Sequence, residues 1–164
     1  MFGFVFSFVV CQSSALASGA LVYGEDVSAS IGETGLEVLV RIDATAPIAG
    51  FQMDWHYPVT EIEIVEVDKV EDFAWFIVDA NANYAPGIVR LLAADSPGAH
   101  SGIIETFIIR FNVLSTATPG NYNLAILDQV FSDSQGVLVV SSATLNVLTI
   151  TDGDEDGDGY SLTD

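Results

Sequence analysis

The sequence predicts an all-β protein, an antiparallel β-sandwich of about nine strands with a jelly-roll-like arrangement. Short runs rich in β-branched and aromatic residues alternate with turn residues roughly every ten positions, which is typical of such sandwiches. No stretch of about a dozen residues keeps the period of a helix. The chain has 164 residues, of which 50% are hydrophobic, enough for one domain with a substantial core and too few for two large ones.

Apolar residues at alternate positions define most of the expected strands. In the run 35–44, for example, Val38, Val40 and Ile42 share one side. The alternation breaks at Val65 and Glu66, where we expect a β-bulge. The expected strands span residues 21–27, 35–44, 48–57, 61–68, 73–79, 87–94, 103–114, 122–130 and 137–150, with a turn at 81–87 and loops at 95–102, 117–120 and 132–136.

The third strand has two chemically different faces. Its large apolar side chains are Phe51, Met53, Trp55 and Tyr57, whereas Gln52, Asp54 and His56 alternate with them. Successive side chains of a strand point to opposite faces of the sheet. We therefore expect the apolar set in the core and the polar set on the outer surface, which is the most promising working surface of the chain.

Two tryptophans raise the question of sugar stacking. Trp55 shares its side of the strand with core residues, so a core position is favoured over a sugar platform. Trp75 and Phe76 are adjacent and must point to opposite sides, so one of them is exposed or covered by a loop. An exposed Trp75 would favour an anchor for a carbohydrate or a protein partner.

The charge excludes several classes of function. Asp and Glu number 23 against 4 Lys and Arg, giving a formal charge of -19. Such a surface repels nucleic acid and anionic membranes. Acidity of this kind suits solubility, calcium binding or a high-salt habitat, and the sequence alone does not separate these three.

The first 17 residues read as a signal peptide. An apolar run at 2–10 is followed by Ala15-Leu16-Ala17, the small-x-small pattern of a cleavage site. The run is too short to span a bilayer as a helix, and the alternative is a buried N-terminal strand. The single cysteine, Cys11, lies within this segment. We expect a secreted, extracellular or cell-surface protein without membrane insertion of the mature chain, whose β-sandwich domain spans residues 20–150.

Several pieces in order resemble a cohesin domain, the sandwich that binds dockerin modules in cellulosome-type assemblies. They are the strand at 49–58, the runs at 62–67, 91–96 and 109–113, the turn at 118–120 and the segment at 133–137. The resemblance covers about 21–150. It implies a non-catalytic module that recognises a dockerin-type protein in an extracellular or cell-surface polysaccharide-degrading assembly.

The resemblance also implies contact residues. Cohesins that bind dockerins through one flat sheet use polar residues on the third strand and at the end of the sixth. The corresponding residues here are Gly50 and Gln52, then Leu91, Ala94 and Gly98, with Tyr84 near a further contact. Asp54 and His56 join this expected contact set as outward residues of the third strand. Cohesins also resemble cellulose-binding modules in fold, so a carbohydrate-binding module that attaches the protein to polysaccharide is the alternative.

The C-terminal segment 151–164 is acidic and rich in Asp and Gly. Asp154, Asp156 and Asp158 are spaced two apart with Gly159 in sixth position, and a register from Asp152 also works. This segment resembles the opening of a dockerin-like or thrombospondin type 3 calcium repeat. Neither register supplies a carboxylate at position twelve, so an acidic linker is the alternative. Calcium is expected in this tail only, and no cofactor is expected for the sandwich.

Catalytic chemistry is not expected. The serines lie outside any nucleophile elbow, and no Gly-rich phosphate loop is present. His56 and His100 are the only histidines, and neither has a Cys or a second His nearby to complete a metal set. Carboxylates such as Glu61 and Glu63 are expected as solvated surface charges. The sequence therefore favours a binding module over an enzyme.

Overall fold

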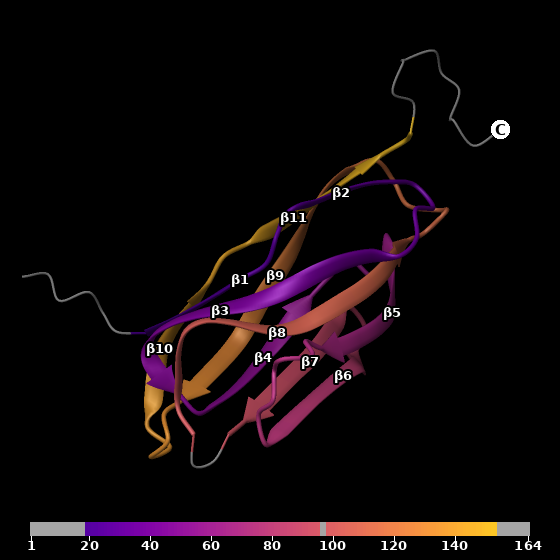
Figure 1. Cartoon of the computed structure of the whole chain (residues 1–164). Helices are drawn as coiled ribbons and strands as arrows, with labels where there is room; N and C mark the ends of the chain where they lie inside the picture. Colours follow the sequence, from indigo (N-terminus) through magenta and orange to yellow (C-terminus); the bar gives the residue numbers. More distant parts are fainter. Residues whose placement is uncertain (1–18, 96–97, 154–164) are drawn as a thin grey trace, which may run out of the picture.

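The computed structural model describes residues 19–95 and 98–153 and contains eleven strands in that part (Figure 1). No helix able to cross a membrane is found among these residues. The strands are β1 (Gly19–Tyr23), β2 (Val27–Ser30), β3 (Leu36–Ile48), β4 (Gly50–His56), β5 (Ile62–Lys69), β6 (Ile77–Ala85), β7 (Ile88–Ala94), β8 (His100–Val113), β9 (Gly120–Ser132), β10 (Leu138–Ala143) and β11 (Asn146–Thr151).

The strands form two layers that continue into each other. The hydrogen-bonded order is β5-β8-β3-β1-β10-β9-β4-β7-β6, and β11 pairs with both β9 and β2. Figure 1 shows β3 and β8 lying across the layer of β4, β7 and β9. Neighbouring strands are antiparallel except for β1 with β10 and β2 with β11, which are parallel. The predicted all-β sandwich is confirmed.

The strand count is eleven instead of nine because two expected strands change partners along their length. β1 pairs with β3 and β10, whereas β2 pairs with β11. Between them the Gly24 amide donates to the Asn146 side chain at 3.1 Å. Likewise, β10 pairs with β1, and β11 pairs with β2. These changes depend on partners far away in sequence, which local alternation does not reveal.

The region around residues 73–87 differs from the prediction. Residues 73–76 are not a strand, and β6 continues through most of the expected turn, which closes only at Pro86–Gly87. Phe73 and Trp75 are buried without sheet pairing because they pack on Phe51, with ring centroids 6.2 and 5.6 Å apart. Phe76 is 81% exposed. The bulge expected near Val65 is confirmed by the register shift between Ile64 and Glu66.

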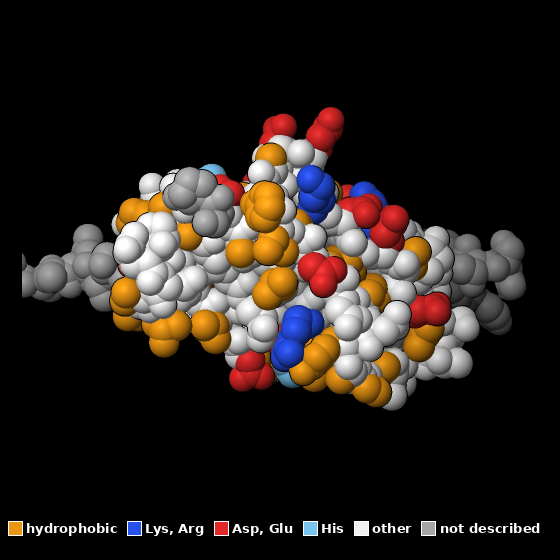
Figure 2. Space-filling model, turned by 90° about the horizontal axis from the view of Figure 1, so that it is seen from below, with side chains coloured by type: hydrophobic (Ala, Val, Ile, Leu, Met, Phe, Trp, Pro, Cys, Tyr) orange, Lys and Arg blue, Asp and Glu red, His pale blue; other side chains and the backbone are white. Residues whose placement is uncertain are grey.

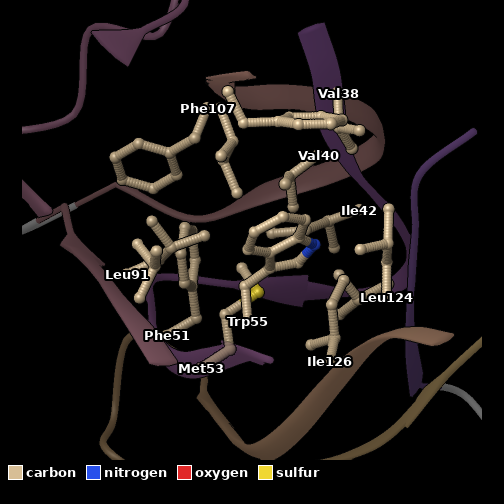
Figure 3. Close-up of a cluster of buried hydrophobic side chains, with 14 of the residues drawn as sticks. Val38, Val40, Ile42, Phe51, Met53, Trp55, Leu91, Phe107, Leu124 and Ile126 are labelled. Atoms are coloured by element: carbon tan, nitrogen blue, oxygen red, sulfur yellow. The ribbon is translucent and has the colours of Figure 1, made fainter. Parts of the chain in front are cut away.

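The core lies between the two layers. Phe51, Met53 and Trp55 point from β4 toward Val40 and Ile42 of β3 and toward Phe107 of β8 (Figure 3). The predicted burial of the first three is confirmed, whereas Tyr57 is half-buried and stacks on Trp55 at 5.6 Å. Full burial of a large apolar side chain stabilises a fold by about 1.5–3 kcal/mol. This packing fixes the orientation of β4 and therefore the side that it turns outward.

Candidate functional site

The outer side of β6, β7, β4 and β9 is built from rows of residues that face one another across the strands. The inward positions of β4, β7 and β9 are buried in the core, and those of β6 are partly buried against it, so the alternate positions point outward. One row consists of Ile77, Ala94, Gly50 and Ser132, and the next consists of Asp79, Leu92, Gln52 and Val130. We call these eight residues the β4 face.

Four of the eight residues of the β4 face are aliphatic, namely Ile77, Ala94, Leu92 and Val130. Ile77 and Val130 are 47% and 50% exposed, and β10 extends the surface with Leu138, which lies opposite Ser132. A shallow depression of about 340 Å³ lies over Gly50, Leu92 and Val130 and their neighbours. On the underside of the molecule in Figure 1, hydrophobic side chains gather in groups between single charged side chains (Figure 2). Such exposed apolar area is typical of a site that binds another macromolecule.

Gly50 helps to keep the centre of this surface low. A Cβ atom at this position would lie 3.2 Å from Ser132 Oγ and 3.5 Å from the Ala93 carbonyl oxygen. The first distance is tighter than ordinary van der Waals contact, so a larger residue would displace its neighbour. Gln52, half-buried beside Gly50, is positioned to offer an amide to a partner. Gly50, Gln52 and Ala94 therefore lie together, as the resemblance implies.

Asp54 is a correction to the sequence interpretation. It is on the outer side of β4, but its residue surface is only 3% exposed. Arg90 of β7 covers it through two hydrogen bonds of 2.7 Å, from Nε and Nη2 to the two carboxylate oxygens. The hydrogen bonds that Arg90 donates to Asp54 raise the pKa of Arg90 above its ordinary value. Asp54 is thus covered by Arg90 and out of reach of a macromolecular partner.

Tyr84 lies on the other side of Arg90. The guanidinium carbon is 3.6 Å from the centre of the tyrosine ring, a cation–π contact, and Tyr84 itself stays partly exposed. Asp54, Arg90 and Tyr84 therefore form one stack at the edge of the β4 face. The sequence placed Tyr84 near a contact region, but it did not reveal that Arg90 joins it to Asp54.

Leu91 is the second correction. It points into the core with no exposed surface, as Figure 3 shows, so it is not a surface contact. Leu92 occupies the outward position instead, opposite Gln52. The segment Leu91–Ala94 has only apolar residues, so its composition gives no alternation from which to read the side.

Gly98 lies in the loop that leads from β7 to β8, away from the two rows. The loop is held by a 2.6 Å contact between Asp95 Oδ2 and His100 Nε2, and the His100 ring stacks on Trp75 at 4.9 Å. A Cβ atom at Gly98 would collide with the Asp95 carboxylate. Gly98 therefore permits this loop conformation.

The remaining predicted positions have mixed outcomes. His56 lies at the end of β4, half-buried, with Asp54 and Asp128 as its acidic neighbours. Asp128, which sequence reasoning missed, has a φ of 51° at an irregularity of the β4–β9 ladder. Asp152 is exposed just after β11. Asp154, Asp156 and Asp158 lie outside the described residues, so the calcium site stays a prediction.

Solved structures with the same fold are cohesins. CaCohA2, a Clostridium acetobutylicum protein solved in complex with CaDoc0917, has a TM-score of 0.72 and 20% identity, with 80% of this chain and 99% of that chain covered. A non-cellulosomal cohesin from Archaeoglobus fulgidus has a TM-score of 0.69 and 19% identity, covering 81% and 91%. The Clostridium thermocellum complex of OlpC cohesin with Doc435 has a TM-score of 0.69 and 17% identity, covering 80% and 92%.

At these identities the structural likeness establishes the fold alone. Comparison with curated protein sequences gives no match. The family model described as "Cohesin domain", however, matches residues 25–151, which is most of the chain. This protein therefore belongs to the cohesin domain family.

Proposed function

We propose that this domain is a non-catalytic module that binds a dockerin-type protein through the β4 face. The observation that carries the proposal is the pair of cross-strand rows, which together form an open surface whose apolar groups are aliphatic and which is backed by a packed core. Similar solved structures support a dockerin as partner, because two of them are cohesins in complex with CaDoc0917 and Doc435.

The dimensions of the surface suit a protein partner. The five neighbouring strands β6, β7, β4, β9 and β10 are spaced about 4.8 Å apart and give a surface about 20 Å wide. A helix with its side chains is about 10–12 Å wide, so this width accommodates at least one helix that lies along the strands. Binding would remove Leu92, Val130 and Ile77 from water, which is the usual source of affinity in such interfaces.

The charge of the chain limits the partner. The formal charge is -19, and Arg41, Arg90 and Arg110 are all engaged in ion pairs within the domain. An acidic partner surface would find no free arginine to pair with. We therefore expect a partner whose contact surface is apolar and neutral or basic, with basic groups near Asp79.

Polysaccharide binding is the second candidate, and the arrangement of aromatic residues favours it less. Trp75 is buried, and Tyr84 is occupied by Arg90. Phe76 is strongly exposed but lies outside the two rows. Sugar-binding faces use aromatic rings as stacking platforms, whereas none of the eight residues of the β4 face is aromatic.

Titration calorimetry with a panel of purified dockerin modules, including CaDoc0917 and Doc435, tests the proposal. Saturable binding of at least one dockerin at a ratio of one to one is the expected result. Affinity electrophoresis in cellulose, xylan and chitin gels provides the comparison. Retardation by a polysaccharide without binding of any dockerin would overturn the proposal.

Secretion and a polysaccharide-degrading assembly are the proposed setting. The support is the predicted signal peptide at 1–17 and the cohesin family, although the archaeal relative is described as non-cellulosomal. We also propose that the 151–164 tail belongs to a calcium repeat. Calcium titration of the whole chain, followed through the tail amides by NMR, tests this part separately.

A further inference from the structure

Three possible metal ligands converge beyond the two rows of the β4 face. Asp54 and His56 are two positions apart on β4 and therefore share its outer side. Asp128 comes from β9, where the ladder with β4 shifts register opposite Gln52 and Asp54. One donor atom from each of the three side chains lies within 4.8 Å of the other two.

His56 supplies a second, independent observation. Its Nε2 atom is buried and has no hydrogen-bond partner among the described residues. Buried polar atoms in folded proteins are nearly always paired, and an unpaired one calls for an explanation such as a bound ion. A neutral imidazole nitrogen carries a lone pair that can bind a metal.

The donor set selects the kind of metal. An imidazole with two carboxylates suits zinc and related divalent transition metals, whereas calcium and magnesium bind through oxygen atoms. Tetrahedral zinc with bonds of about 2.0–2.1 Å holds its donor atoms about 3.4 Å apart. The donor atoms lie within 4.8 Å of one another, and the exposed Asp128 side chain can move to shorten its own distances to the other two.

Arg90 orients one member of the cluster, Asp54. It holds both oxygens of Asp54 at 2.7 Å, and each carboxylate oxygen keeps a further lone pair for a metal. Ligating carboxylates are commonly fixed in this way by an outer hydrogen-bond donor. The Tyr84 ring beneath Arg90 in turn restricts the guanidinium.

We propose that Asp54, His56 and Asp128 form a binding site for one divalent transition-metal ion, with zinc as the best fit. Three protein ligands leave one coordination position of a tetrahedral zinc ion for water or another donor. The site is separate from the acidic tail and requires no dockerin. The metal-site proposal can therefore be tested independently of the proposed function.

The test is zinc titration of the whole chain after treatment with a chelator, in competition with a chromogenic zinc indicator. We expect one zinc ion per chain, and calcium in excess should not displace it. Asp128→Asn should weaken binding at least about tenfold. This variant should fold normally, because Asp128 is exposed and Asn accepts a positive φ well. His56→Gln should have the same effect.

His100→Gln is the matched control, because His100 is the other histidine and also contacts a carboxylate, that of Asp95. It should bind zinc as the unchanged protein does. In NMR spectra of the imidazole nitrogens, zinc should shift the signals of His56 and leave those of His100 in place. The proposal is overturned if zinc does not bind saturably, if His100→Gln alone abolishes binding, or if Asp128→Asn and His56→Gln bind with unchanged affinity.

Discussion

The two outer faces of the sandwich differ in how they use the few cationic residues of the chain. On the face of β3, β8 and β5, Arg41 bridges Glu25 and Glu105. Farther along, Arg110 contacts Glu37, Glu66 and Asp68, which are drawn from β3 and β5. On the opposite side, the two rows of the β4 face contain no ion pair among the described residues, and Asp54 with Arg90 forms a pair at their edge.

The ion pairs suit the face of β3, β8 and β5 to contact with water. The hydrogen bonds that Arg110 donates to Glu37, Asp68 and Glu66 raise the pKa of Arg110. Those that Arg41 donates to Glu25 and Glu105 raise the pKa of Arg41. Each cation thus offsets repulsion within a strongly acidic chain. The two rows of the β4 face expose aliphatic groups without such ion pairs, and binding of the proposed partner would relieve the unfavourable contact of these groups with water.

Leu92→Arg should have the largest effect. A charge at the centre of the β4 face would lose its hydration in the complex without gaining a partner, so dockerin affinity should fall by about 100-fold or more. Leu39→Arg is the matched control, because Leu39 is a half-buried leucine on the opposite outer face. Calorimetry should show nearly unchanged binding for this control. Equal losses in both variants would abolish the distinction between the faces.

Arg90→Met should lower thermal stability the most among arginine substitutions. Asp54 would remain buried without its partner, whereas the carboxylates around Arg110 are exposed and can be hydrated. The unfolding midpoint, followed by circular dichroism, should therefore fall further for Arg90→Met than for Arg110→Met. The reverse order would show that the buried pair is not the more important one.

Gln52→Ala should weaken dockerin binding moderately. Removing one interfacial hydrogen bond costs about 1.4 kcal/mol, or about tenfold in affinity. The fold should be retained because Gln52 is outside the core. Glu37→Ala, on the opposite face, provides the control in the same titration. An unchanged affinity of Gln52→Ala would remove Gln52 from the contact surface.

Arg110→Met should have the smallest effect. Its exposed ion pairs are screened by salt, so a small loss of stability at low ionic strength should disappear at about 1 M salt. Thermal unfolding at the two salt concentrations measures the difference. A loss that persists in high salt would mean that the side chain contributes by packing and not by charge.

Much of the fold follows from the sequence because period-two alternation is a local property. Phe51, Met53 and Trp55 were predicted in the core from that pattern, and they are there. Leu91 was assigned to the contact surface through the family resemblance, and the apolar segment Leu91–Ala94 has no alternation that contradicts this assignment. No local pattern specifies strand register or the position of a bulge. Register brings Arg90 opposite Asp54. The irregularity in the β4–β9 ladder brings Asp128 close to His56.

The most direct measurement is NMR mapping of the isotope-labelled domain during titration with each dockerin of the panel. The account predicts that at least one dockerin binds and that amide shifts concentrate on the outward positions of β4, β7, β9 and β6. The amide signals of Gln52 and of the other residues in the two rows should shift or broaden first. Shifts confined to β3, β8 and β5, or no shifts with any dockerin, would contradict it.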